Sequence, residues 1–257
     1  MSAPNLLICS GLDPSGGAGL IADVRVAAML DTRPVGIVTS ATIQNTLGTL
    51  ASVPIDPEVI RQQLETLLQD IEVTSVKIGM IGSAQVAQAI GDALSLTRAP
   101  VVWDPVARSS RGEAPLVEGG FDQAVIALAP HLLLITPNAH ELELLTGMGV
   151  ADVDDAVEAG KAIAARLSTA VLVKGGHLGA EDAADYLCRA NGVVEIPGVR
   201  ISEGEHVHGT GCALSTAIAA YLANGLELLE ACAEAKRFVA ELIGAPVRPG
   251  RGAAAVM

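Results

Sequence analysis

The sequence predicts an α/β fold with a mostly parallel central sheet and helices on both faces. Short runs rich in β-branched and aliphatic residues alternate along the chain with longer stretches of helical period. The short runs are almost continuously apolar, which is typical of parallel strands that are covered on both faces. The repeated strand–helix order then indicates an open sheet whose strands are joined by right-handed crossovers.

Six strands and six helices are expected in alternation up to Gly175. The expected strands are LLICS (6–10), VGIVTSA (35–41), SVKIGM (75–80), PVVWD (100–104), LLLIT (132–136) and AVLVKG (170–175). The helices between them are expected at about 17–30, 57–69, 83–96, 121–129, 138–146 and 152–167.

Beyond Gly175 the pattern changes. The segment DAADYLCRANGVVEIPGV predicts a hairpin of two short strands around the turn signal Asn191-Gly192. Two helices follow, at about 211–224 and 227–243, and Asn224-Gly225 closes the first. With no internal repeat and no linker, we expect a single domain over 1–257, in which the tail from about residue 245 is loosely ordered.

Composition excludes several classes of function. Sixteen Lys and Arg against 29 Asp and Glu give a formal net charge of -13, which repels polyanions and anionic membranes. Aromatic residues are 2% of the chain, too few for a surface that stacks on bases. We therefore expect no nucleic-acid partner and no membrane partner. A bound phosphate needs local help from helix N-termini, placed cations or a divalent metal.

The four cysteines are widely spaced and form no CxxC pair, which is typical of a reduced, cytoplasmic protein. The N-terminus lacks the basic start of a signal peptide, and no uncharged apolar run approaches the ~20 residues that span a bilayer. We therefore expect a cytoplasmic location.

The motif HGTGC (208–212) opens a long apolar helix on two glycines and a cysteine. Gly209 and Gly211 free the backbone to close around an anion, and the unpaired N–H groups of the first turn favour negative charge. The helix dipole is also expected to lower the pKa of the Cys212 thiol toward neutrality, which suits a proton acceptor or nucleophile. The alternative is a simple helix cap with Cys212 as a small buried filler.

Other polar residues follow the ends of predicted strands, where open α/β sheets bind ligands. Asp104 and Glu141 suit Mg²⁺, although each also suits a helix cap or a solvated position. Lys174 directly follows a buried strand and suits a phosphate, and the Gln44 amide offers both donor and acceptor to a heterocycle. The loop DPSGGAG (13–19) matches neither a Walker A nor a GxGxxG motif, and a plain tight turn explains it equally well. Together these groups favour phosphoryl transfer.

A series of motifs resembles the hydroxymethylpyrimidine/phosphomethylpyrimidine kinases of thiamine biosynthesis, within the ribokinase-like superfamily. The motifs occur in order from about residue 5 to 243: DPSGGAGLIAD (13–23), IQNTLG (43–48), KIGMIGS (77–83), WDPV (103–106), TPNAHE (136–141), VKGGH (173–177) and HGTGCALSTAIAA (208–220). The resemblance implies a ribokinase-like three-layer α/β sandwich. It also implies transfer of the γ-phosphate of ATP to 4-amino-5-hydroxymethyl-2-methylpyrimidine, to its monophosphate, or to both, with Mg²⁺ and in a homodimer.

The resemblance also implies roles for single residues. Gln44 reads the pyrimidine and Met80 packs beside the ring, while Gly11, Asp23 and Val106 belong to the same substrate pocket. The remaining roles fall on the nucleotide side: Cys212 deprotonates or poises the hydroxyl; Gly209, Thr210 and Gly211 hold the phosphoryl group with their amides; Lys174, with Asn138, contacts the nucleotide; and Asp104 and Glu141 bind Mg²⁺.

Two departures from the family pattern concern the substrate. Leu12 replaces a hydroxyl-bearing residue of many relatives, and ARSSRGE (107–113) replaces a Lys-Ser-Gly segment. Arg108 or Arg111 is a candidate for binding the substrate phosphate, with a solvated loop arginine as the alternative. Pyridoxal kinase, whose substrate also carries a ring hydroxymethyl group, is the competing activity. A pyrimidine sensor without catalysis is a third reading.

Overall fold

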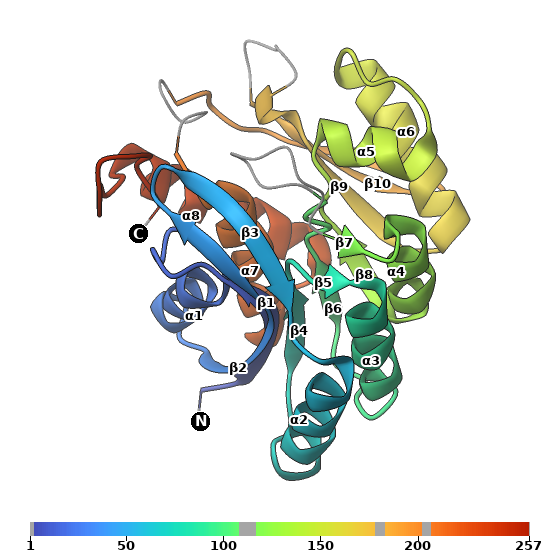
Figure 1. Cartoon of the computed structure of the whole chain (residues 1–257). Helices are drawn as coiled ribbons and strands as arrows, with labels where there is room; N and C mark the ends of the chain where they lie inside the picture. Colours follow the sequence, from blue (N-terminus) through green and yellow to red (C-terminus); the bar gives the residue numbers. More distant parts are fainter. Residues whose placement is uncertain (1–2, 108–116, 178–182, 202–206, 257) are drawn as a thin grey trace.

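The computed structural model describes residues 3–107, 117–177, 183–201 and 207–256 (Figure 1). In these ranges a nine-stranded sheet has the order β11-β10-β9-β8-β6-β4-β1-β2-β3. Its strands are β1 (Asn5–Leu12), β2 (Arg33–Asn45), β3 (Gly48–Pro54), β4 (Ser75–Ile78), β6 (Val101–Trp103), β8 (Leu132–Ile135), β9 (Ala170–Lys174), β10 (Asp185–Arg189) and β11 (Gly192–Ile196). The strands β1, β2, β4, β6, β8 and β9 run parallel, so their carboxyl ends share one edge of the sheet.

Helices cover both faces of this sheet. They are α1 (Gly19–Met29), α2 (Pro57–Asp70), α3 (Ala84–Leu94), α4 (Phe121–Leu128), α5 (Ala139–Thr146), α6 (Val153–Leu167), α7 (Thr210–Ala223) and α8 (Leu228–Gly244). Alternate residues of β1 feed two separate cores: Leu6 and Ile8 pack with α1, α7 and α8, whereas Leu7 and Cys9 pack with α2 to α6. This division explains the continuously apolar strands and confirms the three-layer fold that the sequence predicts.

The elements expected from the sequence are all present, with ends shifted by a few residues. The hairpin is confirmed, since Arg189 of β10 pairs with Gly192 of β11 across the predicted turn. The strand β3, however, is absent from the prediction. It pairs antiparallel with β2 at the sheet edge, and its Leu50 side chain is 83% exposed. A half-exposed edge strand lacks the continuous apolar run that reveals the central strands.

The expectation of a loosely ordered tail is wrong for residues 247–256. Val247 and Ala255 bridge each other, and Ala253 to Val256 are buried. The Ala253 amide donates to the carbonyl oxygen of Thr46 at 3.0 Å, and the Val256 amide donates to that of His208 at 3.2 Å. The tail has no periodic pattern of apolar residues because it packs as an irregular strap against two loops. Backbone hydrogen bonds hold it there instead of a regular helix or strand face.

Four short elements complete the description of the fold. The strands β5 (Gly82–Ser83) and β7 (Val117–Glu118) form a separate two-stranded sheet, and the 3-10 turns η1 (Ala129–His131) and η2 (Gly175–His177) flank β8 and β9. Among the described residues, none of the helices has both the length and the apolar composition that crossing a bilayer demands.

Candidate active site

The first group of predicted residues meets where β6 and β9 end beside the start of α7. Lys174 is the last residue of β9, and its Nζ lies 3.3 Å from Asp104 Oδ1, just beyond β6. A Cβ placed on Gly211 would lie 3.5 Å from Lys174 Nζ and 3.8 Å from Asp104 Oδ2, so the glycine-rich turn passes directly over this pair. The Thr136 hydroxyl also donates to Asp104 at 3.3 Å. The structure therefore brings Lys174, Asp104 and Gly211 together, as the sequence predicts.

Glu141 lies next to this group but has a structural task as well. Asn138 is the N-cap of α5, and the two residues form a capping box: the Asn138 amide donates to Glu141 Oε2 at 2.8 Å and the Glu141 amide donates to Asn138 Oδ1 at 3.0 Å. Burial raises the pKa of the Glu141 carboxyl to about 7; Lys174 opposes this rise and the charge of Asp104 adds to it. Capping and ligand binding are compatible, because a carboxylate has several acceptor positions.

The turn before α7 is possible only with glycine at position 209. Gly209 is the N-cap of α7 and has a φ of 87°, in the left-handed region. A Cβ at this position would also overlap the carbonyl oxygen of Gly17 in the DPSGG loop. The two glycine-rich loops therefore pack backbone to backbone. The backbone amides of Thr210, Gly211 and Cys212 lie in the first turn of α7, where N–H groups have no acceptor within the helix.

The prediction of a low thiol pKa at Cys212 is wrong. Burial raises the pKa of Cys212 to about 12, Lys77 lowers it, and the carboxylates of Asp104 and Asp23 raise it further. The helix dipole acts on a thiol that is largely enclosed by the protein, and the loss of hydration outweighs it. Cys212 is therefore a neutral thiol in the protein without ligands.

A buried ion pair beneath Cys212 is a feature that the sequence analysis missed. Lys77 of β4 and Asp23 of α1 are both fully buried and lie 2.6 Å apart, and the Thr216 hydroxyl donates to Asp23 at 2.8 Å. The signal is present in the sequence, since a lysine inside the apolar run SVKIGM needs a buried partner. Asp23, assigned above to the substrate pocket, is thus held by Lys77 and Thr216 and has no exposed surface.

The remaining predicted pocket residues lie at the ends of β1, β4 and β6. A Cβ on Gly11 would lie 3.0 Å from Met80 Sδ, so these two residues are in contact at neighbouring strand ends. Met80 is buried, and its carbonyl oxygen accepts a hydrogen bond from the Thr39 hydroxyl. Val106 is half-buried two residues beyond Asp104. Arg108 and Arg111 lie outside the described residues.

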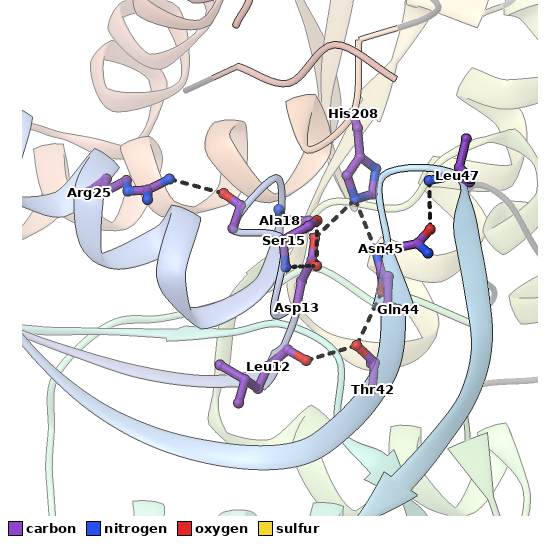
Figure 2. Close-up of polar contacts among 11 residues, drawn as sticks. Leu12, Asp13, Ser15, Ala18, Arg25, Thr42, Gln44, Asn45, Leu47 and His208 are labelled. Carbon is purple, nitrogen blue, oxygen red and sulfur yellow. Dashed lines mark hydrogen bonds and ion pairs between the residues drawn. The ribbon is translucent and has the colours of Figure 1, made fainter. Parts of the chain in front are cut away.

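Gln44 belongs to a second group, in which its side chain points toward His208 (Figure 2). Its Nε2 lies 3.3 Å from His208 Nε2, and its Oε1 lies 3.2 Å from the Thr42 hydroxyl. His208 Nε2 is also 3.4 Å from Asp13 Oδ2. A small pocket runs along this group, lined by Ser15, Gly17, Gln44, Asn45, Thr46, Gly48, Thr49, His208, Pro249, Ala253 and Ala255. His208 is the first residue of the HGTGC motif, and no role is predicted for it from the sequence.

The donor set for a metal is small. In the described part of the chain, no three His, Cys, Asp or Glu side chains gather as a complete metal site. Asp104 and Glu141 are two carboxylates close enough for their charges to interact. Two carboxylates fit Mg²⁺ bound together with nucleotide phosphates, because this ion usually takes one or two protein carboxylates and keeps its other positions for phosphate and water.

Comparison with known proteins shows which family the chain resembles. A family model described as phosphomethylpyrimidine kinase matches residues 13–257. The hydroxymethylpyrimidine/phosphomethylpyrimidine kinase of Rhizobium meliloti is 37% identical over 251 residues, covering 96% of this chain and 94% of the relative. The thiamine biosynthesis bifunctional protein ThiED of Geobacter sulfurreducens is 36% identical over 249 residues, which are 96% of this chain and 51% of that protein.

Two solved structures show the same fold. The phosphomethylpyrimidine kinase of Clostridium difficile has a TM-score of 0.79 at 35% identity, covering 94% of this chain and 99% of the other. The pyridoxal kinase of Staphylococcus aureus in complex with ADP has a TM-score of 0.89 at 27% identity, covering 100% of this chain and 94% of the other. Of these two proteins, the pyrimidine kinase is more similar to this chain in sequence, and the pyridoxal kinase is more similar to it in backbone structure.

Proposed function

The chain belongs to the phosphomethylpyrimidine kinase family and is a kinase of thiamine biosynthesis, and from this premise we propose how its residues carry out the transfer. The acceptor is the hydroxymethyl group of 4-amino-5-hydroxymethyl-2-methylpyrimidine or the phosphate of its monophosphate. The donor is ATP, in keeping with the ADP and AMP-PCP complexes of the S. aureus pyridoxal kinase. The observation that carries the proposal is the convergence of Lys174, Asp104 and the Gly211 turn at one point of the sheet edge.

The transfer itself needs positioning and charge more than covalent chemistry. The amides at Thr210, Gly211 and Cys212 face the phosphoryl group in transit, and Lys174 neutralises charge on the nucleotide phosphates, which Asn138 also contacts. The acceptor oxygen forms its bond to the γ-phosphorus as the bond from that phosphorus to the β-bridging oxygen breaks. Because the transition state of phosphoryl transfer is loose, the acceptor hydroxyl requires no full deprotonation before attack, and its proton passes to an oxygen of the transferred phosphate as the new bond forms.

Cys212 poises the acceptor hydroxyl rather than taking its proton as a thiolate. The two roles that the sequence leaves open are a base and a group that orients the hydroxyl. A thiol whose pKa is about 12 holds its proton at neutral pH, which favours the second role. Lys77 and Asp23 act on the thiol through their charges, and the two effects oppose each other: Lys77 favours the thiolate and Asp23 disfavours it.

Asp104 and Glu141 are the residues that hold Mg²⁺ in this proposal, with Asn138 at the same loop. When bound, the ion offsets the negative charge of the transferring phosphates. A bound cation also favours the ionised form of Glu141, whose carboxyl is otherwise half-protonated near pH 7.

Gln44 recognises the pyrimidine ring by hydrogen bonds, and Met80 and Gly11 pack against the ring.

Exposed apolar side chains on the β2–β3 hairpin support a homodimer, since Ile43, Leu47, Leu50 and Val53 are all more than half exposed. A cytoplasmic location agrees with the four cysteines, all of which are free thiols.

Product analysis tests this function. Enzyme, ATP, Mg²⁺ and the pyrimidine alcohol are incubated and followed by ³¹P NMR, which separates the monophosphate from the diphosphate. We expect ADP and a pyrimidine phosphate to form in step. Gln44→Ala is expected to raise KM for the pyrimidine about tenfold, the size of one lost hydrogen bond. Hydrolysis of ATP without any pyrimidine phosphate would refute the proposal.

A further inference from the structure

Three segments far apart in the sequence meet at the Gln44 amide. Asp13 comes from the loop after β1, Gln44 from the end of β2, and His208 from the turn before α7. Asp13 is buried, and its carboxylate accepts hydrogen bonds from the Ser15 amide at 2.8 Å, the Ser15 hydroxyl at 2.7 Å and the Ala18 amide at 3.1 Å. Asp13 is therefore a fixed acceptor, and His208 is placed between it and Gln44.

The hydrogen count at Thr42 fixes one side of the amide. The Thr42 oxygen lies 2.8 Å from the carbonyl oxygen of Leu12 and 3.2 Å from Gln44 Oε1. A hydroxyl has one hydrogen, and the shorter contact to Leu12 uses it. Two oxygen atoms would then face each other across the longer contact. If the amide nitrogen of Gln44 faces Thr42 instead, it donates to the lone pair that the hydroxyl keeps.

The hydrogen count at His208 fixes the other side. Burial by itself would raise the pKa of Asp13, but hydrogen bonds from His208 and Ser15 outweigh it and lower the pKa, so Asp13 is ionised and only accepts. His208 Nε2 must carry a hydrogen to face this carboxylate. The same nitrogen then has no lone pair for the Gln44 NH₂ group, whereas a carbonyl oxygen at that position can share its hydrogen.

We propose that His208 is a positioning residue that holds the Gln44 amide with its carbonyl oxygen toward His208 and its nitrogen toward Thr42. A half-turn about the Cγ–Cδ bond exchanges the two ends of a carboxamide without moving any other atom. In this orientation every donor meets an acceptor, from Asp13 through His208, Gln44 and Thr42 to the Leu12 carbonyl. One N–H and one oxygen lone pair of Gln44 remain for the ligand.

The free N–H and the free oxygen lone pair of Gln44 match the edge of an aminopyrimidine, which offers a ring nitrogen that accepts a hydrogen bond and an amino group that donates one. The inference therefore rests on the proposed function and deepens it, because it explains how the site recognises a pyrimidine through an oriented amide.

The C-terminal tail holds the backbone of His208 from both sides: the His208 backbone amide donates to the Ala254 carbonyl at 2.8 Å, and the Val256 backbone amide donates to the His208 carbonyl at 3.2 Å.

A kinetic series tests the role of His208. His208→Leu removes the donor at a similar volume, and it is expected to raise KM for the pyrimidine about tenfold, with kcat and KM for ATP within about twofold of wild type. His208→Gln places an amide N–H near the same point and is expected to restore KM to within about threefold of wild type. His131→Leu is the matched control. His131 lies in the 3-10 turn η1 directly before β8, at the sheet edge where the parallel strands begin, and this variant is expected to keep the wild-type kcat and KM values. A folded His208→Leu enzyme with the wild-type KM would overturn the proposal.

NMR gives a readout that does not depend on turnover. In enzyme labelled with ¹⁵N-histidine, the His208 signals are assigned by their loss in His208→Gln, and we expect Nε2 to be protonated. A proton on Nδ1 with a bare Nε2 would overturn the proposal even if the Leu variant fails to fold. Absence of any transfer to the pyrimidine by the wild type would instead refute the proposed function and leave the NMR result to decide on the network.

Discussion

The two sides of the site are assembled in different ways. The phosphate wall, formed by Asp104, Glu141, Lys174 and the turn 209–212, takes its residues from the ends of parallel strands and the starts of helices. The reader wall, formed by Asp13, Gln44, His208 and the tail 247–256, joins the loop after β1, the end of β2 and the turn before α7 to the C-terminal strap by side-chain and backbone contacts. Sheet topology fixes the first wall, and irregular contacts fix the second. Damage to the two walls should therefore appear in different kinetic constants.

The largest effect is expected at the centre of the phosphate wall. Lys174→Met removes the cation that faces Asp104 and that we propose faces the nucleotide phosphates, and it is expected to lower kcat by about 10²- to 10³-fold. KM for the pyrimidine should change little, because the reader wall is intact. Steady-state kinetics with each substrate varied in turn will measure this. Lys161→Met, which removes an exposed lysine paired with Glu158, is the control; an equal loss in both variants would refute a specific role for Lys174.

A smaller loss of the same kind is expected at the thiol. Cys212→Ala is expected to lower kcat by about 10²-fold while the pyrimidine still binds, since the acceptor hydroxyl loses the group that orients it. Equilibrium binding of the pyrimidine by calorimetry, measured beside kcat, separates the two effects. An unchanged kcat would remove Cys212 from the mechanism.

Glu141 links the phosphate wall to stability. Its native pKa of about 7 lies above the value of 4.5 for an unperturbed glutamate, so the folded protein binds this proton more tightly than the unfolded chain. The contribution of Glu141 to stability is thus greatest below about pH 4.5 and is lost as the pH rises toward 7. Glu141→Gln keeps the capping box and has no proton to lose.

We therefore expect the difference in the free energy of unfolding between Glu141→Gln and wild type to rise by on the order of 2 kcal/mol from pH 5 to pH 8, in favour of the variant and without Mg²⁺ or nucleotide. Urea unfolding at the two pH values measures the difference. The exposed substitution Glu230→Gln controls for the loss of one negative charge. A gain that is the same at both pH values would contradict the assigned pKa.

The smallest effect is expected where the tail supports the reader wall. A Cβ on Gly252 would overlap the carbonyl oxygen of Thr46, so Gly252→Ala should loosen the tail at that loop. We expect a loss of about 1 kcal/mol in stability and a rise of about threefold in KM for the pyrimidine, with kcat unchanged. Thermal unfolding and kinetics measure both. Gly244→Ala is the control, because its Cβ would meet nothing within 4 Å. If the two variants have the same stability and the same KM for the pyrimidine, the tail does not support the reader wall.

The difference between the walls also explains what could be predicted from the sequence. Residues such as Lys174 and Asp104 follow apolar runs, and parallel topology brings such strand ends to one edge, so their meeting follows from the pattern. The contact of His208 with Asp13 and the docking of residues 253–256 depend on loop conformations that leave no periodic signal. The raised pKa of Cys212 depends on burial in three dimensions, whereas the sequence displays only the helix start.

Substrate preference tests the central claim most directly, because the backbone resembles a pyridoxal kinase and the sequence a pyrimidine kinase. Values of kcat/KM for 4-amino-5-hydroxymethyl-2-methylpyrimidine and for pyridoxal are measured on one preparation with ATP and Mg²⁺. We expect the pyrimidine to be favoured by at least about tenfold, since the oriented amide of Gln44 matches its edge. A higher kcat/KM for pyridoxal would contradict this account of the site.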